Sequence, residues 1–363
     1  MPKKNPLILS IDTSCDETSA AVTKGLSVLS NVIWSQSNIH ARFGGVVPDT
    51  ARREHERKIS WVIKRAVNTA QYTYGNFDAI SVTVGPGLAI ALGVGINHAK
   101  TLSKKYKKPL IAVNHLEAHL LSPFAQKKTL IETSVDTKIV NYFPAFGLVA
   151  SGGNTILVAI KEIGRYKILA QTMDDALGES LDKSARLIGL GYPGGAILEK
   201  FAKLGNGNAY QLPIPMLGRE YEGSYSYSGI KTAFRRLYEE VSKKDKLTKK
   251  VIYDLAAAYQ KKAFEHFFRI SSKSILLYKD KSYKYLLVGG GVASNISFRK
   301  QVRSMCKNLS LTPLFPYSKK LYGDNAAMIG VCAYFKYLNR DFANVNKVDR
   351  LPNLKINEKT HTS

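Results

Sequence analysis

The sequence predicts an α/β protein built in two halves. Strand-like and helix-like segments alternate along most of its 363 residues, as in an α/β fold with partly parallel sheets. Two similar hairpin patterns, near residues 7–22 and 145–160, open the two halves. A chain of this length exceeds the size at which one hydrophobic core usually stops growing, and its 45% hydrophobic content can fill two cores. We therefore expect two lobes of ordinary domain size.

The two hairpins share one layout, in which a turn of small or polar residues joins two strands. The first turn spans residues 13–17, and the second is Ser151-Gly152-Gly153-Asn154. Glycine and serine let backbone N–H groups approach oxygen atoms, so two such turns facing each other across a cleft would clamp a phosphate. Two unrelated hairpins are the alternative. The expected strands are 7–12, 18–22, 146–150 and 155–160.

The elements after each hairpin continue the alternation. Short apolar runs predict strands, and apolar side chains three and four residues apart predict helices. Gly85-Pro86-Gly87 predicts a turn between a strand and a helix, and the polar residues 350–363 predict a C-terminal tail. The expected elements are a strand at 77–84, a helix at 88–106, a strand at 109–113, a helix at about 114–124, helices at 174–188 and 260–278, and a strand at 284–288.

The composition is strongly basic. Lys and Arg number 53 against 28 Asp and Glu, which gives a formal net charge of +25. A field of this sign attracts phosphate backbones or anionic lipids, and no amphipathic lipid-facing helix stands out, so nucleic acid is the expected partner. A generally basic proteome is the alternative, and lysine runs such as residues 243–250 are more often solvated loops.

The sequence also indicates in which cellular compartment the protein works. Residues 1–6 lack the apolar stretch of a signal peptide, and no run of about 18 uncharged apolar residues follows. Cys15, Cys306 and Cys332 are far apart and form no Cys-x-x-Cys pair. We therefore expect a soluble, cytoplasmic protein in a reducing compartment, without membrane contact.

A pair of histidines suggests a metal site. His115 and His119 are four residues apart in an expected helix, so both imidazoles project from one face and can share a metal ion. Asp324, in a turn before an apolar helix, is the candidate third ligand, with an ordinary helix N-cap as its alternative role. Glu117 lies two residues from each histidine and points away from that face, which disfavours zinc-protease chemistry.

Glycine-rich turns in the second half suggest nucleotide binding. The run 289–291 follows an expected strand and opens a helix, where backbone and helix N-terminus favour anions, and Asn295 lies just beyond it. Asp175, Glu179 and Asp182 share one helical face, although solvent exposure would explain this equally well. The turn 192–195 leads to a helix with Glu199, and a carboxylate near a glycine turn suits ribose hydroxyls.

The order and spacing of several short strings are specific where each string alone is weak. They are IDTSCDET at 11–18, GGVVP at 44–48, GPGL at 85–88, HLEAH at 115–119, SGG at 151–153, DALGESLDK at 175–183, YPGG at 192–195, YSGIKTA at 227–233, GGV at 290–292 and DNAAMI at 324–329. Together they resemble the tRNA N6-adenosine threonylcarbamoyltransferase family, formerly called the O-sialoglycoprotein endopeptidases. The resemblance runs from about residue 7 to residue 330.

The resemblance implies an actin-like/sugar-kinase ATPase fold, a duplicated ribonuclease H-like arrangement of two lobes around a central cleft. The N-terminal lobe would comprise residues 1–122 with about 325–349, and the C-terminal lobe residues 123–324, followed by the polar tail 350–363. It also implies one divalent metal ion per subunit, Fe2+ in preference to Zn2+, held by His115, His119 and Asp324.

The resemblance further implies a reaction. The threonylcarbamoyl group would pass from threonylcarbamoyl-adenylate to N6 of adenosine 37 in tRNAs reading codons that begin with A, with release of AMP. Partner proteins, an inactive paralogue of the same fold and a small ATPase, are expected too. The residues expected at the adenylate are Ala150, Ser151, Gly152, Gly153, Asn154, Asp182, Gly195, Glu199 and Asn295, with Asp182, Gly195 and Glu199 at the ribose and Asn295 near the base.

Two positions depart from the family pattern. Asn154 stands where most bacterial members carry His, although the archaeal and eukaryotic branch uses Asn, and Tyr322 replaces a usual Cys. Neither departure removes an expected metal ligand. By the same resemblance, Arg53 and His55 keep a basic pattern near the tRNA side.

Positioning and charge stabilisation should dominate catalysis, because the exocyclic amine attacks a mixed anhydride that is already activated. Asp12 and Glu17, at the first hairpin turn, are candidates to orient the amine or a water molecule. Arg53 and Arg57 share a helical face and are candidates for the tRNA surface. A metallopeptidase and a non-catalytic nucleotide-binding module are the rival functions.

Overall fold

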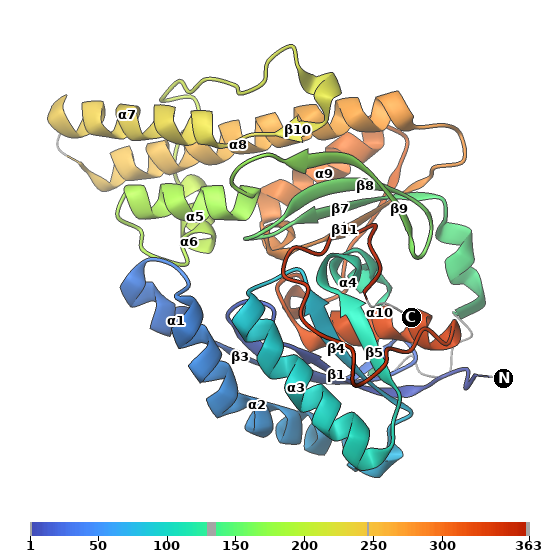
Figure 1. Ribbon diagram of the computed structural model, residues 1–363. Helices are drawn as coiled ribbons and strands as arrows, with labels where there is room; N and C mark the ends of the chain where they lie inside the picture. The colour runs from blue at the N-terminus through green and yellow to red at the C-terminus, as the bar shows by residue number, and fades with distance from the viewer. Residues whose placement is uncertain (1, 129–135, 245–246, 361–363) are drawn as a thin grey trace. The chain divides into compact units, whose positions relative to one another are not determined.

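The computed structural model describes residues 2–128, 136–244 and 247–360. The chain divides into two compact units. Unit 1 comprises Met1–Asn141, Ile163–Arg165 and Phe315–Ser363, and unit 2 comprises Tyr142–Glu162 and Tyr166–Leu314. Among the described residues, each unit carries one six-stranded sheet (Figure 1).

The unit boundaries differ from the expected lobes. Among the described residues, 123–128, 136–141 and 315–324 were expected in the C-terminal lobe but belong to unit 1. Strand β6 (Gln126–Lys127) explains the first shift, because it pairs with β3 (Ser27–Ser35) at the edge of the unit 1 sheet.

The unit 1 sheet has the strand order β5-β4-β1-β2-β3-β6. Its expected first hairpin is confirmed: β1 and β2 pair antiparallel, with Leu7 opposite Lys24. Strand β4 lies parallel to β1, and β5 lies parallel to β4. The strands named here for the first time are β1 (Leu7–Asp12), β2 (Glu17–Lys24), β4 (Ala79–Gly85) and β5 (Leu110–Asn114).

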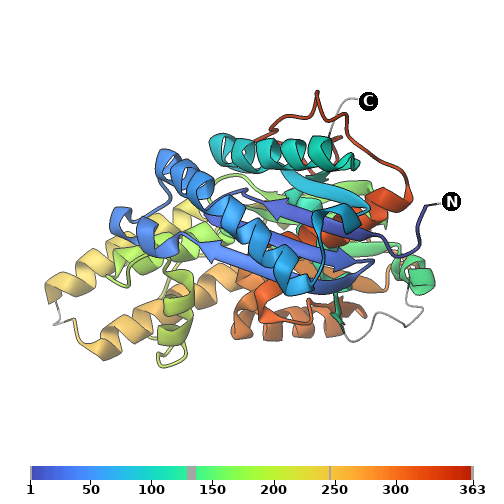
Figure 2. The ribbon, with the colours of Figure 1, turned by 90° about the horizontal axis from the view of Figure 1, so that it is seen from below.

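Both faces of the unit 1 sheet are covered, which is why β1 is buried along its whole length. Alternate side chains of a strand point to opposite faces. Leu7, Leu9 and Ile11 pack in the core with residues of α2 and α3. Figure 2 shows these two helices, in blue and cyan, along the sheet of unit 1. Ser10 faces α10, so Asp12 points to that second face as well. The helices of unit 1 include α2 (Pro48–Ala70), α3 (Ala89–Tyr106), α4 (His115–Leu121) and α10 (Ala326–Leu338).

The expected polar tail is wrong for residues 350–360, which pack on unit 1; residues 361–363 lie outside the described residues. Leu354 and Ile356 are buried, and Leu351 packs against the core. These apolar side chains recur every two or three residues in a polar sequence, so the buried contacts outweigh the polar composition. We call residues 350–356 the C-terminal strap.

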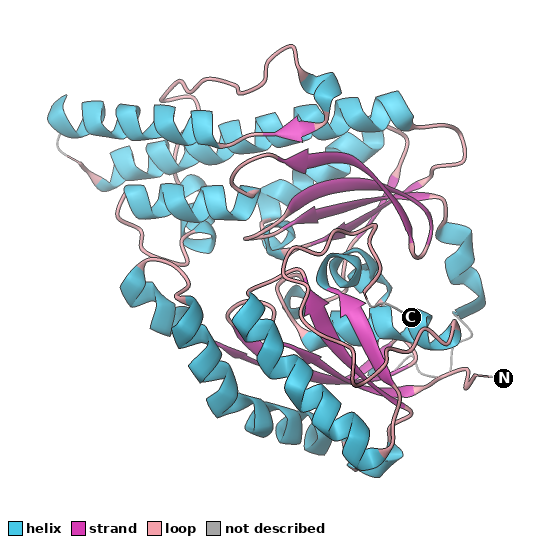
Figure 3. Ribbon diagram, viewed as in Figure 1, coloured by secondary structure: helices cyan, strands magenta, loops and turns pink. Residues whose placement is uncertain are grey.

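The unit 2 sheet has the strand order β10-β9-β8-β7-β11-β12 and repeats the plan of unit 1. Strands β7 and β8 form the second expected hairpin, and β11 lies parallel to β7. Figure 3 shows the helices and strands of each unit. The strands are β7 (Ala145–Ala150), β8 (Thr155–Glu162), β9 (Arg165–Thr172), β10 (Ser224–Tyr225), β11 (Tyr285–Gly289) and β12 (Thr312–Leu314), and the helices include α5 (Leu177–Leu187), α6 (Gly195–Ala202), α7 (Ser228–Lys244), α8 (Lys249–Tyr278) and α9 (Ile296–Asn308).

Helix ends differ from the expected ones where side chains cap them. The helix expected at 260–278 is the second part of α8, which begins after its N-cap Thr248. After Gly290 the chain forms a short 3-10 helix, and α9 begins only after Asn295. In the parts of the chain that the structure describes, no helix has both the length and the apolar character needed to cross a bilayer.

Candidate metal and nucleotide-binding sites

Helix α4 presents both histidines from the end of β5. The side chain of Asn114 caps the helix and accepts hydrogen bonds from the backbone N–H groups of Leu116 (2.9 Å) and Glu117 (3.3 Å). His115 and His119 lie one turn apart with ring centroids 4.7 Å apart and nearly perpendicular planes. The expected shared face of the two imidazoles is therefore present.

Asp324 is not the cap of α10. That role belongs to Asn325, whose side-chain oxygen accepts from Met328 N–H at 3.2 Å. The alternative role for Asp324 is therefore wrong. Its Oδ1 instead lies 3.1 Å from His119 Nε2 and 3.4 Å from His115 Nε2.

These three side chains fit a divalent metal ion. One ligand atom from each of His115, His119 and Asp324 lies within 4.8 Å of the others. The histidines are buried, and neither Nδ1 has a hydrogen-bond partner among the described residues. Two imidazoles and one carboxylate suit a catalytic transition metal and leave coordination positions for substrate.

The side chains of the site shift one another's pKa values. Burial alone would lower the pKa of His115, but the charges of Asp324 and Asp12 outweigh it and raise that pKa to about 9. Burial and the neighbouring His115 lower the pKa of His119. The two histidines hold the pKa of Asp324 well below its usual range, against the effect of its burial. Asp324 therefore keeps its negative charge.

Asp12 supports the site from β1. Its carboxylate is fully buried, and Oδ1 lies 3.8 Å from His115 Nδ1. Oδ1 accepts from Ser14 N–H at 3.3 Å, whereas Asp12 Oδ2 and His115 Nδ1 are both buried without a partner among the described residues. This is the chemistry of a carboxylate that orients a metal-binding histidine through its second nitrogen.

Glu17 is partly exposed and accepts a hydrogen bond from Ser35 Oγ at 3.0 Å. Desolvation and the nearby charges of Asp16 and Asp324 raise its pKa well above the usual value. A carboxylate in this state is a stronger base than an ordinary one.

Glu117 does not face the histidine cluster. It is buried and lies beside Cys332 and Lys336 of α10, both of which feel its charge. The expected orientation of Glu117 is confirmed, and it is unsuited to act as the general base of a zinc protease.

The turn after β7 exposes two glycines in unit 2. Ser151 N–H donates to Asn154 O at 2.8 Å, and Asn154 N–H donates to Ser151 Oγ at 3.1 Å. Gly152 and Gly153 are exposed, and a Cβ at either would meet nothing within 4 Å. Packing within the chain therefore does not require these glycines, whereas a close oxygen ligand would.

Helix α5 begins against this turn, a contact that the sequence reasoning missed. Gly178 N–H donates to Ser151 O at 3.1 Å, and a Cβ at Gly178 would lie 2.5 Å from that oxygen. The only signal in the sequence is a glycine in the first turn of an amphipathic helix. One helical turn further, Asp182 Oδ1 accepts from Gly194 N–H (2.9 Å) and Gly195 N–H (2.6 Å).

The remaining residues expected at the adenylate join the same set of contacts. Glu199 Oε1 accepts from Ile296 N–H at 2.9 Å, next to Asn295. Asn295 is buried, caps α9 through Phe298 N–H and donates to Gln260 Oε1 at 2.8 Å.

Gly290 packs closely against Ala150. Its φ is +93°, and a Cβ there would lie 2.3 Å from Ala150 O. All nine residues that the family resemblance implies at the adenylate belong to unit 2.

A network of ion pairs and hydrogen bonds surrounds the two aspartates that precede α5. Asp175 accepts from Lys183 at 2.6 Å and from Lys231, and Asp174 accepts from the backbone of Tyr227 and from Ser228. Residues 227–233, which include the first turn of α7, are thus bonded to the residues just before α5.

The basic residues expected near tRNA lie on α2. Arg53 and Arg57 are exposed and form ion pairs with Asp49 and Glu54 on the same helix. His55 differs: it is buried and bonded to Thr18 Oγ1 (2.7 Å), and burial lowers its pKa. The basic pattern on this helix therefore excludes His55.

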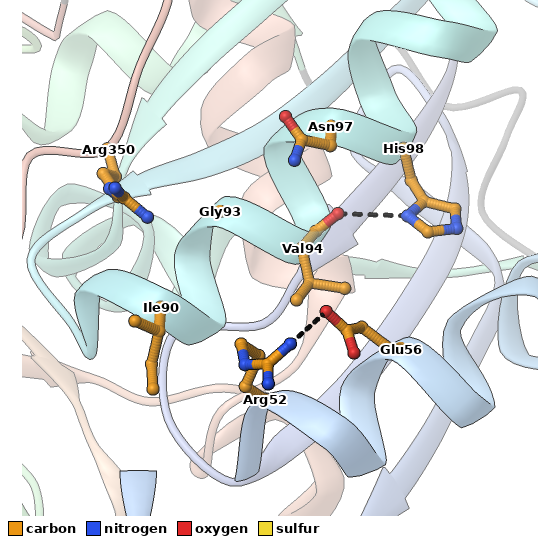
Figure 4. A pocket seen from close by; sticks show the side chains of 8 residues that line it. All are labelled: Arg52, Glu56, Ile90, Gly93, Val94, Asn97, His98 and Arg350. Carbon is orange, nitrogen blue, oxygen red and sulfur yellow. Dashed lines mark hydrogen bonds and ion pairs between the residues drawn. The ribbon is translucent and has the colours of Figure 1, made fainter. Parts of the chain in front are cut away.

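A shallow hollow of about 250 Å³ lies in unit 1 (Figure 4). It is bounded by Arg52 and Glu56 of α2, which form an ion pair, and by Gly93 of α3. The Arg350 side chain reaches in from the C-terminal strap. This hollow is separate from the histidine cluster.

The chain is similar to known proteins over most of its length. The family model for tRNA N6-adenosine threonylcarbamoyltransferase matches residues 27–331. The enzyme of that name from Clostridium kluyveri is 42% identical over 358 residues, which is 98% of this chain and 99% of the relative. The one from Clostridioides difficile strain 630 is 39% identical over 97% of this chain and 99% of the relative.

Solved structures show the fold. HypF from T. kodakarensis has a TM-score of 0.57 at 14% identity, covering 94% of this chain and 48% of that one. Component A of the Acidaminococcus fermentans (R)-2-hydroxyglutaryl-CoA dehydratase has a TM-score of 0.52 at 12% identity, covering 92% and 99%. The fold is that of the actin-like/sugar-kinase ATPases, as predicted. With the matches over most of its length, the chain belongs to the tRNA N6-adenosine threonylcarbamoyltransferase family.

Proposed function

We propose that this protein transfers the threonylcarbamoyl group from threonylcarbamoyl-adenylate to N6 of adenosine 37, in tRNAs that read codons beginning with A, and releases AMP. The observation that carries the proposal is the convergence of His115, His119 and Asp324 in a chain of this family. The reaction takes place where tRNA is used, in the cytoplasm. The partner proteins would be an inactive paralogue of the same fold and a small ATPase.

The metal ion would be held by His115 Nε2, His119 Nε2 and Asp324. When bound, it supplies Lewis-acid polarisation of the carbamoyl carbonyl and anchors donor oxygens. Two histidines and one carboxylate with open positions favour Fe2+ over Zn2+. Asp12 would accept a hydrogen bond from His115 Nδ1 and so keep Nε2 free of its proton.

The donor would bind through its phosphate in unit 2. The exposed backbone of Gly152 and Gly153 provides N–H groups at the turn. The N-terminus of α5 lies directly behind Ser151 and adds the positive end of a helix dipole. Asp182 keeps the Gly194-Gly195 turn in place, where the ribose hydroxyls would lie.

The transfer forms one bond and breaks another. The adenosine N6 nitrogen bonds to the carbamoyl carbon, and the bond from that carbon to the adenylate phosphate oxygen breaks. AMP leaves with the electron pair, and the proton released from N6 passes to a carboxylate or to water. Glu17 is the candidate to accept the hydrogen bond from the amine, because desolvation and the nearby acids raise its pKa and so make its carboxylate a stronger base.

Mass spectrometry of nucleosides tests this proposal. Unmodified tRNA is incubated with the purified protein, its partner proteins, Fe2+ and threonylcarbamoyl-adenylate, then digested. We expect N6-threonylcarbamoyladenosine and an equal amount of AMP. Protein substrates should remain uncleaved under the same conditions. Donor consumption without any modified adenosine would refute the proposed acceptor.

A further inference from the structure

The C-terminal strap passes the C-terminal ends of β4 and β5 and reaches the start of the histidine helix. Leu351 N–H donates to Val84 O at 2.7 Å, at the end of β4. Gly87 N–H, in the turn after β4, donates to Pro352 O at 3.1 Å. Figure 1 shows this red segment passing β4 and β5 beside α4.

The strap is bonded to the residue that starts α4. Asn114 Nδ2 donates to Lys355 O at 3.0 Å, while its Oδ1 accepts from the first turn of the helix. Both ends of one buried amide are therefore used, one for the helix cap and one for the strap. Leu354 and Ile356, buried on either side of Lys355, fix the position of that carbonyl.

Helix α4 needs such support. It has only seven residues, and a helix this short is not stable by itself. A metal site is sensitive to the groups that hold its ligands, because small displacements of a ligand weaken coordination.

We propose that the C-terminal strap is a positioning element for the metal site, acting through Asn114 to fix α4 and thereby His115 and His119. This inference rests on the proposed metal site. It assigns a role in metal binding to residues 350–356, which lie 19 to 25 residues beyond the last residue that the family model matches.

The test compares variants that separate the two functions of Asn114. Asn114→Ser keeps a good N-cap but removes the donor to Lys355 O, whereas Asn114→Ala removes both. A chain ending at Leu354 removes the acceptor, and a chain ending at Thr360 is its matched control. Each purified apoprotein is titrated with Co2+, whose visible spectrum reports coordination, and its folding is checked by circular dichroism.

We expect Asn114→Ser to bind Co2+ about three- to tenfold more weakly, with an altered spectrum and an intact fold. The chain ending at Leu354 should show a similar loss, and Asn114→Ser should add nothing further in that background. The chain ending at Thr360 should bind like the full chain.

Wild-type affinity and spectrum in Asn114→Ser would overturn the role of the strap, and this variant decides alone if the shortened chain does not fold. An unreduced effect of Asn114→Ser in the folded chain ending at Leu354 would also overturn it. Failure of the full-length protein to bind Co2+ would instead refute the proposed metal site.

Discussion

His119 combines full burial with a hydrogen-bonding distance of 3.1 Å to Asp324, so it should be indispensable as a ligand. We predict that His119→Ala loses both bound metal and tRNA modification, because two remaining ligands hold a divalent ion weakly. Metal analysis of the purified protein and nucleoside mass spectrometry measure the two effects. The control is His98→Ala, on the surface hollow of α3. Full metal occupancy in His119→Ala would remove the residue from the site.

Asp12 should affect metal affinity without being a ligand. Asp12→Ala removes the buried carboxylate that faces His115 Nδ1, so we expect metal binding to weaken by about tenfold or more. Asp12→Asn keeps the shape and one acceptor oxygen and should lose less. Calorimetric titration of the apoproteins with Zn2+ distinguishes the two variants. Equal affinities in all three proteins would leave Asp12 without this role.

His266 should make unit 2 sensitive to acid. Burial lowers its pKa to about 4, although Pro215 O and Asp174 favour the protonated form, and its Nε2 accepts from Ser226 N–H at 3.1 Å. The unfolded imidazole takes up a proton near pH 6.5, whereas the folded one stays neutral until about pH 4. Its contribution to stability is therefore complete above pH 6.5 and is lost as the pH falls through that window.

The loss attributable to His266 amounts to at most about 3 kcal/mol. Urea unfolding at pH 7.5 and pH 5.0 should show a smaller pH effect in His266→Gln than in the wild type. His98→Gln, which changes a partly exposed histidine of unit 1, should leave the difference unchanged. An identical pH effect in His266→Gln would contradict the prediction.

Among the turns, the one after β11 gives a sharp contrast between neighbouring glycines. Gly290 has a φ of +93° and no room for a Cβ, since Ala150 O would lie 2.3 Å away. Gly291 has nothing within 4 Å of that position. We predict that Gly290→Ala destabilises unit 2 by several kcal/mol, whereas Gly291→Ala changes stability by less than about 1 kcal/mol. Thermal unfolding measures both, and equal melting temperatures would contradict the predicted clash.

Local patterns were enough to predict seven of the strands that the structure describes, but not β3, β6, β9, β10 or β12. The first hairpin, the second hairpin and β11 are short apolar runs beside glycine or small polar turns, and these signals depend on neighbours in sequence. The histidine pair could be predicted for the same reason, because four residues place two side chains on one face of any helix.

Features that depend on distant contacts could not be predicted. Asp324 and Asn325 are both good caps, but Asp324 instead contacts His115 and His119, which are distant in sequence, and Asn325 caps α10. The strap is polar in sequence, so its burial could not be predicted. The residues that bury it, at the end of β4 and in the turn after it, are distant in sequence. His55 lies in a basic stretch of sequence that is typical of an exposed surface. It is nevertheless buried, because it lies on the inner face of α2.

The net charge of +25 concerns the molecule as a whole, and its effect should appear in the salt dependence of tRNA binding. Each phosphate contact adds about 0.7 to 0.9 to the slope of log K against log salt, so about five contacts would reduce affinity on the order of a hundredfold between 50 and 200 mM salt. Replacing Arg53 and Arg57 by Ala should lower this slope by at most about two, because both already pair with acids on α2.

Filter binding of tRNA over this salt range measures the slope. Arg219→Ala is the control, since Arg219 is equally exposed and ion-paired but lies in unit 2. A slope unchanged by the double replacement would remove these arginines from the RNA surface. A flat slope in the wild type would give the basic charge another cause.

The discontinuous composition of unit 1 has a consequence during translation. His119 and Asp324 are 205 residues apart, so at about 5 to 20 residues per second the ribosome delivers the aspartate roughly 10 to 40 s after the histidine. All of unit 2 lies between His119 and Asp324 in the sequence. It is therefore synthesised in that interval and is complete before unit 1. A nascent chain stalled anywhere in unit 2 therefore carries the histidine helix with neither its carboxylate nor the strap. Capture of the metal would then mark the polypeptides whose synthesis has run nearly to its end.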